Sequence, residues 1–289
     1  MLTPEQVAHF RALGFIMLKD LFSSEEIVTI SQSFDEVMEQ DRKGEEFKGQ
    51  KRHSAMAMVE RHPALRSLID DDRIHEPVQQ LLGGDYMWFG SDGNLYVGDT
   101  HWHSDAQKPE IGLGRIKIGF YLDPVSENTG CLRVIAGSHR QPLHAKLKPL
   151  WLGRIIQTIE EGRNTDEALK PFIEMGLDPD IDPFSVRPSD IPGVALESTP
   201  GDILIFDHLI FHSSWGGKTG RRMFSMNYFS NPTTNEQIDL MRQVYTGSLG
   251  ITQVLSSSQR NTLHEDEIIN SDRPRIQRMM ARNLELGLR

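Results

Sequence analysis

Apolar and polar residues in the first third of the chain alternate with the spacing of helices that pack one face against a sheet. Thr3 and Gln6 form a capping-box pattern, and Gly14 follows the last apolar position of the stripe, so both ends of a first helix are marked. Ser23 begins a second pattern of the same kind. The elements predicted here are a helix over residues 3–13, a strand over 15–18, a helix that starts at Ser23, and helical structure over 63–82.

From residue 86 onward the pattern changes to short β-branched and aliphatic runs separated by turn residues, which is typical of strands. Strands are predicted over residues 86–97, 116–122, 131–135 and 221–229, and another run begins after Gly201-Asp202. Helices are predicted over residues 236–245 and 273–286.

Residues 140–198 interrupt this strand rhythm with a helix-like run over 155–161 and a segment rich in aspartate and proline. Long insertions of this kind are usually lids or binding loops. We therefore expect this insert to cover a functional site. A surface decoration away from any site is the alternative.

The composition is that of an ordinary globular protein. The chain has 289 residues, of which 38% are hydrophobic and 25% charged, and this length allows a substantial core. A formal net charge of −10 and the lack of a basic tract argue against a nucleic-acid partner. No apolar run approaches the roughly 18–20 residues of a membrane span.

Two further features concern the compartment. The single cysteine, Cys131, permits no intrachain disulfide, which fits a reducing environment. Glu5 stands where an export signal would be building its apolar region. We therefore expect a cytoplasmic protein that binds neither membranes nor nucleic acids. The sequence predicts no oligomeric state.

The candidate chemistry begins at His103 and Asp105. Residues two apart in a strand project from the same face, so both side chains can reach one metal ion. A lone His-x-Asp is a weak signal because chains of this composition often carry one by chance, and a strand histidine without any metal is the alternative. With a second imidazole, the pair would complete the facial triad of an iron(II) site and leave positions open for substrate and oxygen.

A second stretch offers the missing imidazole. Gly201-Asp202 marks a break in regular structure, an aliphatic run follows, and His208 and His212 come after that run. Residues 213–220 are predicted to form a loop that leads into the strand over 221–229. Both histidines are candidates for the third ligand at this point.

Four motifs occur in a family's order: Trp102-His103-Ser104-Asp105, Glu127-Asn128-Thr129-Gly130-Cys131-Leu132, Ala136-Gly137-Ser138-His139, and the segment from Gly201-Asp202 through His212 to Arg221. With them the chain resembles the phytanoyl-CoA dioxygenase family of iron(II)/2-oxoglutarate-dependent oxygenases. The helix start at residues 2–6 and the strand at 14–18 are also typical of that family. The resemblance thus covers most of the chain.

The resemblance implies that His103, Asp105 and His212 are the metal ligands. The family places its distal histidine ten residues after the aspartate of the Gly-Asp pair, which selects His212 over His208. His101 and His208 are then supporting groups or ordinary strand histidines. Related halogenases replace the carboxylate with a small residue, so the presence of Asp105 favours hydroxylation.

The resemblance also implies a cosubstrate site. Arg221 matches the arginine that binds the far carboxylate of 2-oxoglutarate, which needs a planar, always-charged, bidentate partner. Arg222 is the alternative, although alignment of the small residue Ser225 favours Arg221, and the unused arginine would face solvent. Ser214 matches a position that often hydrogen-bonds the cosubstrate; a plain loop serine is the alternative.

The fold implied by the resemblance is mainly β, a double-stranded β-helix of the jelly-roll or cupin-like type with eight core strands and flanking helices. We expect one oxygenase domain over residues 1–289, with a helical flank at 1–84, the barrel core at 85–230, the lid-like insert at 140–198 and C-terminal helices at 231–289. The charged segment 41–52 is expected to be a loop near the mouth of the site.

The implied activity is hydroxylation of an unactivated carbon of a small organic metabolite, with O2 as oxidant, 2-oxoglutarate as cosubstrate, and succinate and CO2 as products. Alternatives are an acyl-CoA hydroxylase, which the acidic balance disfavours, a cupin enzyme that does not use 2-oxoglutarate, and a non-catalytic metal- or ligand-binding β-barrel. Arg115, Lys117 and Arg133 are either partners for an anionic substrate group or exposed charges at strand ends.

Overall fold

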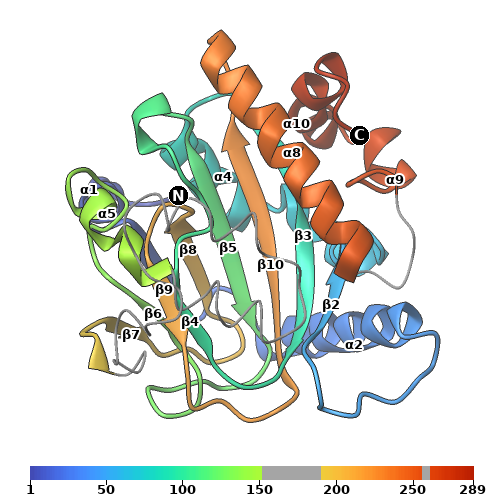
Figure 1. The fold of residues 1–289 in the computed structure, drawn as a ribbon. Coiled ribbons are helices and arrows are strands. Elements are labelled where there is room, and N and C mark those ends of the chain that lie inside the picture. The colour runs from blue at the N-terminus through green and yellow to red at the C-terminus, as the bar shows by residue number, and fades with distance from the viewer. Residues whose placement is uncertain (152–189, 256–260) are drawn as a thin grey trace.

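The computed structural model describes residues 1–151, 190–255 and 261–289, and Figure 1 shows their arrangement. The described strands form a six-stranded sheet in the order β1-β8-β5-β10-β3-β2 and a four-stranded sheet in the order β4-β9-β6-β7. The strands are β1 (Phe15–Leu18), β2 (His53–Met56), β3 (Tyr86–Tyr96), β4 (Thr100–His103), β5 (Arg115–Tyr121), β6 (Leu132–Val134), β7 (Val194–Leu196), β8 (Ile203–Asp207), β9 (His212–Ser214) and β10 (Arg221–Ser230).

The distribution of strands β3 to β10 over the two sheets defines the fold class. Four of them, in the order β8-β5-β10-β3, form the centre of the large sheet, and the other four form the small sheet, with antiparallel pairing throughout. Two facing antiparallel sheets of this kind make a jelly roll. The predicted jelly-roll class is therefore confirmed, and β1 and β2 extend the large sheet at its two edges.

The helices cover the large sheet. They are α1 (Pro4–Leu13), α2 (Ser24–Asp41), α3 (Pro63–Arg66), α4 (Asp72–Leu82), α5 (Leu143–Leu147), α8 (Asn235–Leu255), α9 (Asp266–Ile269) and α10 (Pro274–Glu285), with short 3₁₀ turns η1 (Ser67–Asp70), η2 (Pro109–Ile111) and η3 (Lys148–Leu150). The capping boxes predicted at Thr3 and Ser23 are both formed. Gly14 ends α1 with a φ of 85°, a conformation that costs glycine least.

One hydrophobic core joins the two ends of the chain to the sheet. It contains Phe34 of α2, Val78 of α4 and Met279 of α10, packed with Phe224 and Tyr228 of β10. Helices from both termini therefore cover the same outer face of the large sheet, and α8 crosses the opposite face (Figure 1).

Two predicted helices differ from the structure. The helical segment predicted over residues 63–82 is broken into α3, η1 and α4. The helix predicted over 236–245 continues to Leu255, although Gly247 and Gly250 lie inside it and glycine costs about 1 kcal/mol relative to alanine in a helix. Burial of Leu240 and Met241 against β3 and β10 residues offsets that cost.

Most of the predicted lid, residues 152–189, including its helix-like run over 155–161, lies outside the described residues. Within the part of the chain that is described, no helix has both the length and the apolar composition of a membrane span.

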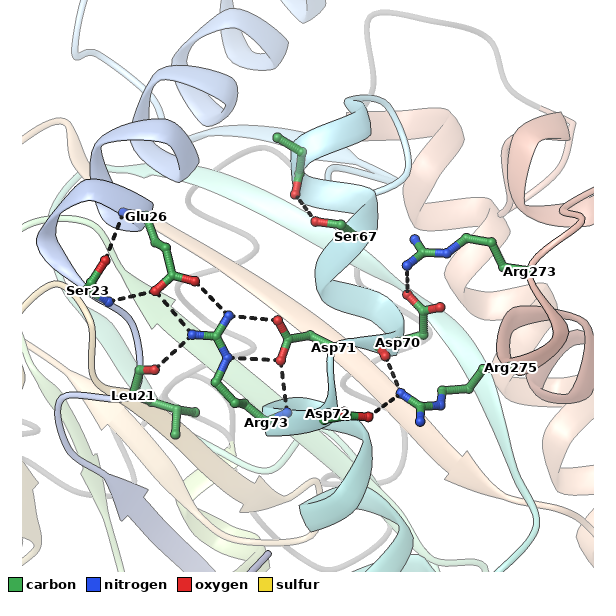
Figure 2. Close-up of polar contacts among 11 residues, drawn as sticks. Leu21, Ser23, Glu26, Ser67, Asp70, Asp71, Asp72, Arg73, Arg273 and Arg275 are labelled. Atoms are coloured by element: carbon green, nitrogen blue, oxygen red, sulfur yellow. Dashed lines mark hydrogen bonds and ion pairs between the residues drawn. The ribbon is translucent and has the colours of Figure 1, made fainter.

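A network of charged groups fastens α4 to α2, and a second one fastens it to the C-terminal helices (Figure 2). Arg73 pairs with Glu26 at the start of α2 and with Asp71, at 2.8 Å from each carboxylate, and its guanidinium lies over the Phe22 ring. Hydrogen bonding from Arg73 lowers the pKa of Glu26 to about 2. Two further pairs lead to α10: Asp70 with Arg273, and Asp72 with Arg275.

The Arg73 network predicts a pH-dependent contribution to stability. Because folding depresses the pKa of Glu26, its contribution is present above pH 4.5 and is lost as the pH falls towards 2. Arg73→Met should lower the free energy of unfolding by about 1 kcal/mol at pH 6, a figure that allows for solvent screening of this half-exposed pair. That deficit should shrink by pH 3, as measured by urea unfolding.

Arg242→Met is the matched control, because Arg242 forms an exposed pair with Asp239. It should change stability little at either pH. An Arg73→Met deficit that is equal at pH 6 and pH 3 would contradict the ion-pair origin.

Candidate active site

Strand pairing brings the two predicted histidine ligands together. His103 ends β4 and His212 begins β9, and the two residues are direct partners in the β4–β9 register. Their ring centroids are 4.2 Å apart. Asp105 joins them, with Oδ1 3.6 Å from His103 Nε2 and Oδ2 3.8 Å from His212 Nε2. One ligand atom from each of the three residues lies within 4.8 Å of the others.

The reason predicted for this convergence was partly wrong. Asp105 was expected on a strand, two residues after His103, but β4 ends at His103 and Asp105 lies in a bend. The buried Ser104 hydroxyl holds the bend, with its Oγ 2.7 Å from the Ala106 carbonyl and 3.1 Å from the His208 carbonyl. A turn of the chain, rather than strand alternation, aims the carboxylate at the histidines.

Backbone carbonyls orient both imidazoles. Nδ1 of His103 lies 2.8 Å from the carbonyl of His101, and Nδ1 of His212 lies 3.0 Å from the carbonyl of Ile210. A neutral ring that donates from Nδ1 keeps a lone pair on Nε2, the atom that faces Asp105. The donor set therefore fits a divalent transition metal of the iron or zinc type. His101 takes part through its backbone carbonyl.

Lys117 of β5 holds the carboxylate in its ionised form. Its Nζ lies 2.5 Å from Asp105 Oδ2. Burial alone would raise the pKa of Asp105, but Lys117, His212 and His103 hold that pKa well below its usual range. Burial likewise opposes the charge on Lys117, and Asp105 and Asp92 raise the pKa of the ammonium in spite of it. Both groups are thus charged and neutralise each other.

The alternative of exposed strand-end charges is wrong for all three basic residues singled out in the sequence. Arg115 and Arg133 are buried, and the Lys117 side chain is only 18% exposed. Arg115 donates to the Gln107 carbonyl, and the guanidinium of Arg133 lies 4.1 Å from the centre of the Trp215 ring. Of the three, Lys117 lines the cavity beside the ligand cluster.

Arg221 and Arg222 have different environments. Arg222 pairs with Asp123 and Asp35 and is partly exposed. Arg221 is 1% exposed, and its Nη2 donates to the hydroxyl of Ser214, which in turn donates to the Gly130 carbonyl. The two residues that the resemblance assigned separately to the cosubstrate site are therefore joined by a direct hydrogen bond.

The hydrogen bonding of the Arg221 guanidinium is incomplete, and an anion could complete it. Its Nε and Nη1 have no hydrogen-bond partner among the described residues, although the side chain is fully buried. A Cβ added at Gly217 would lie 1.4 Å from Nη1, and one at Gly130 would lie 2.2 Å from it. Two glycines thus leave just enough space for this guanidinium. A buried carboxylate of a ligand would satisfy the free donors.

A cavity of about 380 Å³ opens onto the ligand cluster. His103, Asp105, His212 and Ser214 line it, whereas Arg221 lies behind Ser214 and the ring of Tyr96.

Two further residues line the cavity, and sequence reasoning assigned neither of them a defined role. Arg52 comes from the charged segment expected near the mouth; it donates to Asn94 and lies over the Tyr96 ring. His208, expected to be a supporting or ordinary strand histidine, follows β8 and is 7% exposed, with Nε2 unpartnered among the described residues. Burial lowers the pKa of His208 to about 3, so its ring is neutral.

Comparisons with known proteins agree with this fold. An ectoine dioxygenase of Bordetella bronchiseptica is 25% identical over 155 residues, which are 48% of this chain and 50% of the relative. The chain therefore spans about half the length of this curated relative.

Two solved structures have the same architecture. EctD from S. alaskensis with bound Fe matches with a TM-score of 0.55 and 20% identity, over 79% of this chain and 77% of that one. The non-heme alpha ketoglutarate dependent carbocyclase SnoK from nogalamycin biosynthesis matches with a TM-score of 0.53 and 21% identity, over 80% and 85%. At these identities the likeness establishes the fold.

The family model for phytanoyl-CoA dioxygenase matches residues 10–224, about three quarters of the sequence. This range includes all four motifs quoted from the sequence, the ligand cluster and Arg221. The predicted resemblance is confirmed: the chain belongs to the phytanoyl-CoA dioxygenase (PhyH) family.

Proposed function

We propose that this chain is an iron(II)- and 2-oxoglutarate-dependent dioxygenase that hydroxylates a small organic molecule. His103, Asp105 and His212 would hold the iron. The observation that carries the proposal is the convergence of two Nε2 lone pairs and an ionised carboxylate within 4.8 Å at the wall of a cavity. Family membership supports it, as do the iron in the EctD structure and the α-ketoglutarate dependence named for SnoK.

The reaction proposed is the oxidation of a substrate C–H bond to C–OH by O2. One oxygen atom enters the substrate and the other enters 2-oxoglutarate, which loses CO2 and becomes succinate. The bound iron would supply the activation of O2 that organic side chains cannot. The protein's task is then to fix the ligands, bind the cosubstrate and substrate, and exclude water.

Each metal-binding side chain has a partner that limits its freedom. Backbone carbonyls fix the ring orientation of His103 and His212, and Lys117 occupies Asp105 Oδ2. Lys117 therefore leaves Oδ1 as the less encumbered oxygen for the metal. Such supporting contacts typically change metal affinity by about 10- to 100-fold.

Strand β9 connects the metal site to the proposed cosubstrate site. His212 and Ser214 lie two residues apart on this strand, and Ser214 hydrogen-bonds Arg221. A 2-oxoglutarate molecule that places its far carboxylate on Arg221 would have its keto-acid end directed towards His212. The free Nε and Nη1 donors of Arg221 suit the bidentate contact that a carboxylate makes.

The cavity favours a small substrate over an acyl-CoA. Its volume of about 380 Å³ has to hold both the cosubstrate and the reacting part of the substrate. The described residues that line it offer Arg52 and Lys117 as cations, and both already contact protein oxygens. They form no open basic patch for a polyanionic carrier such as coenzyme A.

We also propose that the whole chain acts as one domain. Its terminal helices share a hydrophobic core with the β-barrel, and α8 packs on the cavity side of β3 and β10. These shared cores leave no part of the described chain with a core of its own.

Removal of the carboxylate ligand should abolish metal binding. We expect Asp105→Ala to weaken binding of iron(II) or its substitute Mn(II) by on the order of 100-fold or more, because two imidazoles alone hold a divalent ion poorly. Isothermal titration calorimetry under anaerobic conditions measures this. Asp239→Ala, which alters an exposed aspartate of α8, should bind metal like the wild type. Equal affinities in the two variants would refute the ligand set.

Loss of the buried arginine should weaken cosubstrate binding and leave the metal in place. We expect Arg221→Met to reduce 2-oxoglutarate affinity of the Mn(II)-loaded protein by roughly 10- to 100-fold, since hydrogen bonds to charged groups contribute about 1.5–3 kcal/mol. Arg222→Met should have little effect. The reverse order would transfer the role to Arg222, and no loss in either variant would favour a metal enzyme that does not use 2-oxoglutarate.

Gly217→Ala tests the same site without removal of the charge. The new methyl group has to displace the Arg221 guanidinium, because only 1.4 Å separates the two atoms. We expect 2-oxoglutarate affinity to fall by roughly 10-fold while the Mn(II) affinity stays unchanged. Gly247→Ala, where a Cβ meets open space, is the control. If Gly217→Ala binds 2-oxoglutarate like the wild type, Arg221 does not hold it in this position.

A further inference from the structure

His208 is a polar group that the proposed metal and cosubstrate sites do not use. It is more than nine-tenths buried, lines the cavity, and has no hydrogen-bond partner at Nε2 among the described residues. Buried polar atoms in native structures nearly always have a partner, so an orphan atom at a cavity wall indicates a ligand.

The chemistry of the missing partner follows from the other ring nitrogen. His208 hydrogen-bonds the backbone of Ile116, and this bond favours the protonated ring, as a bond to a carbonyl oxygen does. A carbonyl oxygen of that backbone would take the Nδ1 proton of a neutral ring, and Nε2 is the nitrogen without a partner among the described residues. Nε2 of the neutral ring therefore carries a lone pair. Its complement is a hydroxyl, amine or amide group that donates a hydrogen.

His208 has charged neighbours, Lys117, Asp105 and Arg115, and an apolar side formed by aromatic rings. Its ring meets that of Phe229 edge-on at a centroid distance of 5.3 Å, and Phe229 stacks on Phe89 at 4.3 Å. Phe89 and Phe229 belong to a hydrophobic cluster that Val244 of α8 also joins.

Helix α8 crosses in front of β10 and β3 (Figure 1), and one of its faces lines the cavity. Val244, Ser248, Ile251 and Thr252 line the cavity, and their spacing of four, three and one places them on one helical face. All four are uncharged. Ile251 is 55% exposed, so its side chain is accessible to a ligand in the cavity.

This wall lies far from the proposed cosubstrate site. Arg221 and Phe229 are eight residues apart on β10, which corresponds to roughly 26 Å at about 3.3 Å per residue. The cavity side of β10 between them carries Met223, Ser225 and Asn227. The cosubstrate end and the apolar end are therefore separate regions of one cavity.

The apolar wall is also separate from the family pattern. The family model matches residues 10–224, whereas α8 spans Asn235–Leu255. The metal and cosubstrate residues thus lie inside the matched range, and the α8 face lies outside it.

We propose that His208 and the inner face of α8 form the substrate subsite, and that its occupant is a small, uncharged or singly aminated molecule. Its apolar carbon skeleton would pack between Phe229 and Ile251, and a hydroxyl, amine or amide on that skeleton would donate to His208 Nε2. An anionic group is disfavoured at this end, because the phenylalanines and the α8 face supply no cation and the nearby Lys117 is already paired with Asp105. The inference rests on the dioxygenase function proposed above and specifies the substrate class.

Matched probes test the proposal on Zn(II)-loaded protein saturated with 2-oxoglutarate. The probes are cyclohexanol, methoxycyclohexane and cyclohexanecarboxylate, which share one ring and differ in donor and charge. Ligand-observed NMR titration measures their dissociation constants. We expect cyclohexanol to bind about 5- to 10-fold more tightly than methoxycyclohexane, the range of one neutral hydrogen bond. The carboxylate should bind most weakly.

Variants of His208 and Ile251 test which residue causes the preference for cyclohexanol over its ether. His208→Leu should remove the preference for cyclohexanol over its ether, and His208→Gln, which restores an acceptor oxygen, should recover part of it. Ile251→Ser should weaken the alcohol and the ether alike, by about 5-fold. Val28→Ser is the matched control, because Val28 is also a 55% exposed aliphatic residue but lies on α2.

Three results would overturn the subsite: no binding of cyclohexanol up to its solubility limit, a preference that survives in His208→Leu, or tighter binding of the carboxylate. 2-Oxoglutarate binding by the wild-type protein, titrated in the same samples, separates this failure from that of the proposed function. If 2-oxoglutarate binds but one of these three results is obtained with the probes, only the subsite is wrong. If 2-oxoglutarate does not bind, the dioxygenase proposal itself is wrong.

Discussion

The geometry of the candidate site depends on the pairing of two very short strands, β4 and β9. This pairing sets His103 opposite His212 and Thr100 opposite Ser214. A slip of one residue would turn one imidazole to the other face of the sheet and carry Ser214 away from Arg221. The same few main-chain hydrogen bonds therefore fix the spacing of the two rings and the position of the arginine relative to them. A four-residue and a three-residue strand are weak elements alone, and β6 on the far side of β9 supports the pair.

Buried charge is the second constraint, and the protein meets it in two ways. Asp105 and Lys117 neutralise each other at 2.5 Å, so this pair is complete within the protein. Arg221 is different, because within the described residues it donates only to the neutral hydroxyl of Ser214, and two of its nitrogens have no partner there. An unpaired buried donor costs about 1–3 kcal/mol, more when it is charged. The fold thus tolerates a local instability at Arg221 that a bound carboxylate would relieve, which is common at functional sites.

Much of this organisation could be predicted from the sequence, and the exceptions have physical reasons. Both capping boxes follow from the local residue pattern, whereas the jelly-roll class and the set His103, Asp105 and His212 follow from the resemblance to a known family. The bend at Ser104 does not, because a serine hydroxyl that bonds two carbonyls looks in sequence like any strand serine.

The alternatives left open for Lys117 and His208 could not be decided from the sequence for a related reason. A charged or polar residue in an apolar run is usually exposed, and only the packing of β5 and β8 shows that these two side chains turn inward. The length of α8 was underestimated because local propensity weighs Gly247 and Gly250 but not the burial of Leu240 and Met241.

The layout of β10 explains how one core can serve different substrates. Along this strand, alternate residues pass from Arg221, behind the cavity, through Ser225 and Asn227 to Phe229, which line it, that is, from a charged end through a polar middle to an apolar end. Lys117 stands opposite Asn227 in the β5–β10 register, beside the ligand cluster in the middle.

Main-chain hydrogen bonds of β3 and β5 fix the charged and polar portions. The apolar end is closed by a helix that contacts the barrel through side chains such as Val244 and Leu240. Changes on that helix would reshape the substrate end while the metal ligands keep their spacing, because no ligand is held by α8. The strands thus hold the residues for the chemistry rigidly, and the separately packed helix can change substrate selectivity without moving them.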